Sequence, residues 1–172
     1  MQDFLKPVIV LFCICLVVGA LLAVVNSVTA PIVEENARIK AEETRQAVLE
    51  GATSFTEVEA DLEALGVQSI YVEDSGLGYV ITAGYKGYGG DVVVTVGLNN
   101  DGEVVGMSVD TSTETSGIGT KASKPEYVEN FIGATGNVDG IDTITSATYS
   151  SKAVKNGVNA VLNAYAEIGG GK

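Results

Sequence analysis

Histidine and tryptophan are absent from this sequence, and basic residues are scarce. Ten Lys and Arg stand against 22 Asp and Glu, which gives a formal net charge of −12. Without histidine there is no histidine-based acid–base catalysis and no histidine ligation of a metal. Without a basic face the chain is poorly suited to bind nucleic acid. Any reaction at this protein must therefore use other groups or a cofactor.

Cysteine is almost absent as well. Cys13 and Cys15 both lie in an apolar N-terminal run, so the rest of the chain has no thiol. Two residues apart on a helix, the pair would point in different directions, which favours packing or lipid-facing thiols over a metal or redox site.

The apolar run from Val8 to Val25 contains no charged residue and is long enough to cross a bilayer as a helix. A cleaved signal peptide is the alternative, because residues 28–30 (Val-Thr-Ala) could serve as a cleavage site. The length of the apolar core favours a retained anchor. Lys6 precedes the run and acidic residues follow it, so the positive-inside rule predicts a cytoplasmic N-terminus and an extracytoplasmic main domain.

The rest of the chain predicts an α+β fold: a single N-terminal transmembrane helix followed by one extracytoplasmic domain, in which an antiparallel sheet is flanked by helices. The predicted parts are an anchor with its cytoplasmic stub (1–30), a helical stalk with accessory helices (31–66), the main domain (67–168) and a flexible tail (169–172). Within 31–66 we expect one polar helix over 31–50 and a second, shorter helix within 51–65, where Val58, Leu62 and Leu65 repeat at helical spacing.

Alternating and apolar runs predict four strands in the main domain. They are 69–72, 78–85, 91–98 and 103–109. The turn Asn99-Asn100-Asp101-Gly102 should join the last two as a hairpin, because Asp-Gly tolerates positive φ. The glycine-rich segment 85–90 is interpreted as a mobile connection, with a loop whose backbone approaches a flat ligand as the alternative. Residues 126–131 are interpreted as a short helix.

A last helix is predicted beyond Ser151, with Val154, Val158, Val161, Leu162 and Tyr165 on one face. Serine and threonine before it are natural N-caps. No acid occurs from 143 to 166, while Lys152 and Lys155 lie in the opening turns, where a cation opposes the helix dipole. Hydroxyls, free N–H groups and the dipole together could bind a phosphate. The alternative is a capped helix with two solvated lysines.

Two short motifs in this sequence resemble motifs of a known protein family. Residues 145–148, Thr-Ser-Ala-Thr, resemble the Ser/Thr-Gly-Ala-Thr motif of the FMN-binding domain found in the G subunit of Rnf complexes and the C subunit of sodium-pumping NADH:quinone oxidoreductases. Residues 114–119, Glu-Thr-Ser-Gly-Ile-Gly, resemble that family's Glu-Thr-Pro-Gly-Leu-Gly, and 87–90 match its Gly-Tyr-x-Gly. Ser146 departs from the family glycine and could impose an unfavourable φ on a tight turn; we expect Ser146→Gly to leave flavin attachment unchanged or improved.

The resemblance implies a cofactor, FMN, joined to Thr148 through a phosphoester by a separate flavin transferase that uses FAD and a divalent metal. It implies a membrane-bound electron carrier that is not a complete enzyme alone, working with other subunits of a membrane complex that moves ions. Four lysines, 121, 124, 152 and 155, bracket the two motifs and would favour the phosphate. The implied cofactor-binding residues are Glu114, Thr115, Gly117, Ile118, Gly119, Lys121, Thr145, Ser146, Ala147, Thr148 and Lys152.

Two alternatives remain open at this point. The chain could be a covalent flavoprotein of another extracytoplasmic electron-transfer system. It could also be a membrane-tethered binding module without a cofactor, in which residues 145–151 only cap a helix.

Overall fold

The computed structural model describes residues 2–60 and 62–169, except for the side chains of residues 2–6 and 63. The chain divides into two compact units, Met1–Glu42 and Glu43–Lys172. Helix α1, Gln2–Val48, continues without interruption through the predicted anchor and the predicted polar helix. Within the described part of the chain it is the one helix long and apolar enough to cross a membrane. Of the predicted tail, only Gly169 is described.

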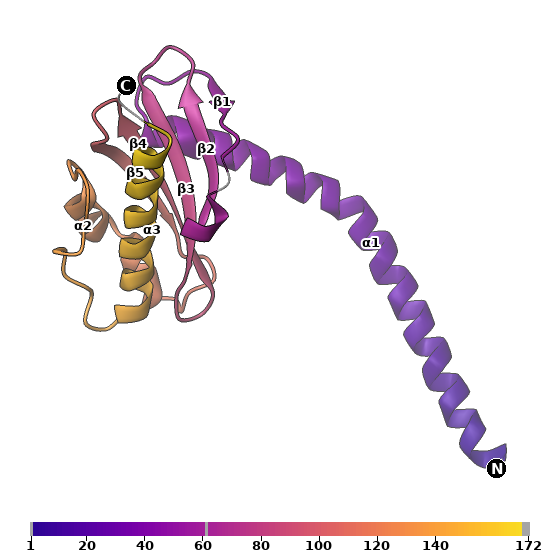
Figure 1. Cartoon of the computed structure of the whole chain (residues 1–172). Coiled ribbons are helices and arrows are strands. Elements are labelled where there is room, and N and C mark those ends of the chain that lie inside the picture. The colour runs from indigo at the N-terminus through magenta and orange to yellow at the C-terminus, as the bar shows by residue number, and fades with distance from the viewer. Residues whose placement is uncertain (1, 61, 170–172) are drawn as a thin grey trace. The chain divides into compact units, whose positions relative to one another are not determined.

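The second unit is built on a five-stranded antiparallel sheet with strands in chain order (Figure 1). The strands are β1 Phe55–Glu57, β2 Val67–Glu73, β3 Gly78–Lys86, β4 Asp91–Asn99 and β5 Val104–Asp110. Four of them confirm the predicted strands. The predicted β4–β5 hairpin is also confirmed, with Gly102 at φ +75° in its turn.

The second helix predicted within 51–65 is wrong. This segment contains β1, which pairs with β2, and a single 3-10 turn, Glu63–Leu65. Val58 donates its N–H to the carbonyl of Ile70 at 2.9 Å, so the segment extends the sheet edge. Val58, Leu62 and Leu65 still pack on the main core. Apolar spacing had correctly identified side chains that contact the core, although they are only partly buried, but three apolar residues at this spacing do not require a helix.

Helix α3, Thr148–Glu167, lies across one face of the sheet (Figure 1). Its predicted apolar stripe is confirmed, since all five of the predicted side chains are buried. The helix approaches the sheet closely at Gly157, where a Cβ would lie only 2.5 Å from Cγ2 of Val94. The segment between β5 and α3 contains a 3-10 turn Gly119–Ser123, α2 Pro125–Val128 and a 3-10 turn Glu129–Phe131. The predicted short helix over 126–131 thus divides into two turns.

The opposite face of the sheet carries a smaller core around Val48, at the end of α1, and Val80. Close approach is possible because β4 and β5 have glycines there: a Cβ at Gly97 or Gly106 would overlap the carbonyl oxygen of Val48. Packed side chains thus cover both faces of the sheet. The sheet therefore gives the loops at the start of α3 a rigid support.

Candidate functional site

The two motifs meet at one pocket, which also includes Tyr88 from the loop between β3 and β4. Its volume is ≈ 490 Å³, within the range of about 300–1,000 Å³ typical of small-molecule sites. The lining residues are Tyr88, Glu114, Thr115, Ile118, Gly119, Thr145, Ser146, Ala147, Thr148, Tyr149 and Ser150. All predicted site residues except Gly117, Lys121 and Lys152 therefore line this pocket.

Glu114 joins the segments that surround the pocket. It is only 8% exposed. One carboxylate oxygen accepts hydrogen bonds from the N–H groups of Tyr88 (2.8 Å) and Gly89 (3.2 Å), and the other accepts from the hydroxyl of Ser150 (2.8 Å). Charge-assisted bonds of this kind are the strong ones. Both oxygens are engaged by the protein itself, so Glu114 positions the walls of the pocket.

Two glycines make room for this carboxylate. A Cβ at Gly87 would overlap the carboxylate of Glu114 and come within 2.9 Å of Val92, and a Cβ at Gly119 would overlap the same carboxylate and come within 2.9 Å of Ser150 Oγ. The interpretation of 85–90 as a mobile connection needs correction. The loop is closed by a 2.8 Å bond from the N–H of Gly87 to the carbonyl of Gly90, and Glu114 holds it from behind.

The start of α3 differs from the expectation of a Ser or Thr cap. The N-cap is Ala147, without a side-chain capping bond, and Thr148 is already the first helical residue. Among the described residues, no oxygen accepts a hydrogen bond from the N–H groups of Thr148, Tyr149 or Ser150. The buried hydroxyl of Ser151 instead fixes the preceding turn, since it accepts from the N–H of Ile144 (3.1 Å) and donates to the carbonyl of Ala147 (2.8 Å).

The three residues that carry these N–H groups line the pocket, at the positive end of a 20-residue helix. A helix with a side-chain cap would have used one or two of them internally. The uncapped start leaves them available to an anionic group.

Of the four lysines expected to favour a phosphate, the structure bonds one to a residue of the pocket wall. Lys121 donates from Nζ to Oγ of Ser146 at 3.0 Å and thereby connects the two motifs. Lys155 is used elsewhere, because its ammonium group binds the carbonyls of Asp139 (2.8 Å) and Ile141 (2.6 Å). Lys124 and Lys152 are exposed and do not line the pocket. Of the four lysines, Lys121 is thus the one bonded to a pocket residue, and a role of these cations beside a phosphate stays a prediction.

The hydroxyl of Thr148 has only loose contacts. Its Oγ1 lies 3.5 Å from the carbonyl oxygens of Ile144 and Thr145, and the residue is half-buried. Glu114 is the one carboxylate among the lining residues, and its oxygens already have donors. Asp142 is exposed and outside the lining. A threonine hydroxyl needs a base or metal to act as a nucleophile, so a reaction here would need a base from outside the pocket.

Two further expectations concern the turns. No non-glycine residue in the described part of the chain has a positive φ, so Ser146 fits without the strain considered above. Gly117 does not line the pocket. It has φ +76° at the apex of its loop, and its N–H donates to the hydroxyl of Thr120 at 2.9 Å. This glycine serves the loop conformation.

Sequence reasoning missed Tyr88, Tyr149 and Ser150 as pocket residues. Tyr88 was missed because it lies in a glycine-rich segment that was interpreted as a connection. Tyr149 and Ser150 directly follow the predicted attachment residue, but no role was assigned to them. An aromatic residue within a loop of three glycines was the available signal, since such a side chain has no obvious core to join.

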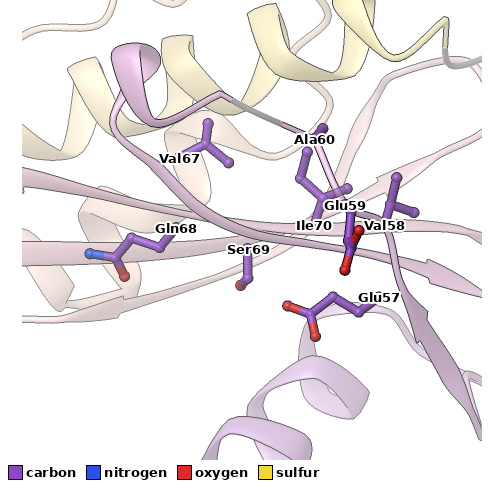
Figure 2. Close-up of a pocket in the computed structure, with 8 residues that line it drawn as sticks. All are labelled: Glu57, Val58, Glu59, Ala60, Val67, Gln68, Ser69 and Ile70. Carbon is purple, nitrogen blue, oxygen red and sulfur yellow. The ribbon is translucent and has the colours of Figure 1, made fainter.

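A second hollow lies where β1 and the segment after it face the start of β2 (Figure 2). Its volume is ≈ 360 Å³. Glu57 and Glu59 contribute carboxylates, and no Lys or Arg is among its lining residues. An anionic ligand would be repelled there, and the hollow shares no residue with the pocket at Thr148.

Comparison with known proteins supports a relationship that covers the pocket. Residues 87–163 match the sequence model of the FMN-binding domain family. Over nearly the whole chain, the protein is 28% identical to the G subunit of the proton-translocating ferredoxin:NAD⁺ oxidoreductase complex of Clostridium ljungdahlii (92% of this chain, 89% of the relative). It is 32% identical to the G subunit of the Na⁺-translocating ferredoxin:NAD⁺ oxidoreductase complex of Acetobacterium woodii (93% and 90%).

Proposed function

Because this chain belongs to the family of FMN-binding-domain proteins that includes the G subunits of the ion-translocating ferredoxin:NAD⁺ oxidoreductases, we propose that it carries FMN as a phosphoester on Thr148. In this proposal it is a membrane-anchored electron-transfer subunit of such a complex. The observation that carries the proposal is the position of Thr148: a loosely held hydroxyl on the pocket wall, at the uncapped start of α3.

The residues present fit the cofactor. A phosphate on the Thr148 oxygen would lie at the free N–H groups of the first helical turn, where the helix dipole favours negative charge. The ammonium group of Lys121, held by Ser146, supplies the nearby cation. In a protein of net charge −12 this local arrangement offsets the repulsion that the phosphate would otherwise meet.

Attachment would require a flavin transferase. The Thr148 oxygen would form a bond to the FMN phosphorus of FAD, the bond between the two phosphates would break with AMP as the leaving group, and the hydroxyl proton would pass to a base on the transferase. The turn before α3 is accessible for this, because Asp142, Thr145 and Ser146 are exposed. Bound FMN supplies reversible electron acceptance, and the protein supplies position and electrostatics.

The anchor completes the proposal. The apolar side chains of α1 from Val8 to Val33 are exposed, as suits a helix in lipid. We propose that Lys6 stays in the cytoplasm and that the domain lies outside. The two relatives are named as subunits of complexes that move ions, so the partners proposed here are the other subunits of such a complex.

Intact-mass analysis tests the proposal directly. Full-length protein matured in its own cell envelope should be heavier than its polypeptide by one FMN less one water. Thr148→Val should abolish the increment, and Thr135→Val, which removes an exposed hydroxyl that does not line the pocket, should keep it. A wild-type mass equal to that of the bare chain would support the cofactor-free binding module instead.

A further inference from the structure

Two tyrosines stand exposed on the pocket wall. Tyr88 is 76% exposed and Tyr149 is 69% exposed. Their ring centroids are 6.3 Å apart and the ring planes are inclined at 47°. Within the described part of the chain, neither phenol hydroxyl has a hydrogen-bond partner. Tyrosine rings carry a large apolar surface that is usually at least partly buried, so this pair presents unused ring surface to the pocket.

The backbones that carry the rings are fixed by one group. Glu114 accepts the N–H of Tyr88 with one oxygen and holds Ser150, the neighbour of Tyr149, with the other. The backbone segments that carry the rings are far apart in the sequence but are joined through this carboxylate. Such preorganisation lowers the entropy cost of binding a ligand.

The lining of the pocket includes both polar and apolar groups. Thr148 and the free N–H groups of the α3 start form the polar part, and Tyr88, Tyr149 and Ile118 form the exposed apolar part. A ligand with a phosphate at one end and a flat apolar ring at the other matches both parts. Because Tyr149 directly follows Thr148, a ligand tethered to Thr148 through its phosphate is attached next to one of these aromatic residues.

We propose that Tyr88 and Tyr149 bind the isoalloxazine ring of the FMN carried by Thr148, an inference that rests on the function proposed above. A flat ring between two parallel aromatic faces needs about 7 Å, twice the optimal carbon–carbon separation. The observed 6.3 Å and 47° are too close and too inclined for this. The flavin ring accordingly packs against one side of the pair, in an offset or edge contact.

Flavin fluorescence gives the test, because a tyrosine ring in contact quenches it: an electron passes from the phenol to the excited flavin and then returns, with no net oxidation. Full-length flavinylated protein in detergent is compared with Tyr88→Ala, Tyr149→Ala and the double variant. Emission is expressed per attached FMN, as counted by intact mass. We expect a several-fold rise in the double variant and smaller rises in the single variants.

Ile132→Ala is the control, because it removes an exposed aliphatic side chain that does not line the pocket and is not an electron donor. Its emission per FMN should stay close to wild type. In Tyr88→Phe with Tyr149→Phe, the visible circular dichroism of the flavin should be retained, because the stacking surface remains, whereas the double alanine variant should lose it.

The outcomes separate the two proposals. A wild-type chain with no mass increment overturns the attachment to Thr148. Full mass increments combined with unchanged emission and unchanged visible dichroism in the double alanine variant overturn the ring-binding role alone. If that variant instead keeps both signals and loses electron transfer to its partner, the tyrosines are a protein-docking surface, and the inference is wrong.

Discussion

The carboxylate of Glu114 accepts a 2.8 Å hydrogen bond from the hydroxyl of Ser150, 36 residues further along the chain. This contact joins the loop after β5 to the first turn of α3. The same carboxylate holds the β3–β4 loop through Tyr88 and Gly89. The shape of the pocket therefore depends on one buried acid.

Glu114→Ala should destabilise the domain, because it leaves three polar groups without their acceptor. We expect a loss of about 2 kcal/mol in the free energy of unfolding, measured by thermal circular dichroism of the full-length chain in detergent. Glu126→Ala, at an exposed position of α2, is the control and should change stability by no more than about 0.5 kcal/mol. Equal stability of both variants would show that the Glu114 contacts contribute little.

Gly119→Ala should disturb the same junction by overpacking. The new methyl group would overlap Glu114 and press on Ser150, at a cost of about 1–3 kcal/mol. Attachment of FMN should fall with it, because the start of α3 is displaced. Gly140→Ala adds the same methyl group where no atom lies within 4 Å, and it should behave as wild type. Melting temperature and intact mass of the two variants provide the comparison.

Lys121→Gln should slow flavin attachment several-fold, because the cation beside the incoming phosphate is lost while the reach to Ser146 is largely kept. Lys124→Gln removes the same charge from a nearby exposed position away from the pocket and should have little effect. The rates are followed by intact mass during incubation with transferase and FAD. A slowing shared equally by both variants would indicate a general effect of net charge.

Ser146→Gly should still be flavinylated, because the Ser146 backbone has no positive φ that a glycine would relieve. The substitution removes the hydroxyl that accepts the hydrogen bond from Lys121. The rate of flavin attachment in this variant should therefore be at most slightly above that of wild type. The time course of the mass increment measures this. A clear loss of attachment would show that the serine hydroxyl is needed to orient Lys121.

Glu73 makes stability depend on acid pH. The hydroxyl of Ser75, supported by backbone N–H groups that include that of Leu77, holds the pKa of this buried carboxyl below its ordinary value against the opposing effect of burial. A carboxyl whose pKa is lower in the folded than in the unfolded state stabilises the fold at pH values above its unfolded-state pKa. That stability is lost as the pH falls through the folded-state pKa. Thermal melts from neutral to acid pH should therefore fall less steeply for Glu73→Gln, which should also melt lower at neutral pH. Parallel pH profiles would contradict this.

Local patterns were enough to predict much of the fold. Alternating β-branched residues predicted β2 to β5, Asp101-Gly102 predicted the hairpin, and the apolar stripe predicted the buried face of α3. These features depend on neighbours within a few residues, so the chain records them locally. Residues 55–57 were missed because an edge strand takes its conformation from a partner strand in the sheet rather than from its own period.

The attachment motif and the loop at 114–119 were also evident from residue order alone, whereas their meeting in one pocket depends on the packing of α3 against the sheet. That packing decided which lysine is near: Lys155 donates to the carbonyls of Asp139 and Ile141, whereas Lys121 donates to Ser146. Linear spacing cannot reveal this, because the direction of a long side chain is set by acceptors distant in the sequence. The amino-acid order alone thus predicted most of the elements and the hydroxyl proposed for attachment, while the tertiary structure decided which charges and rings lie near it.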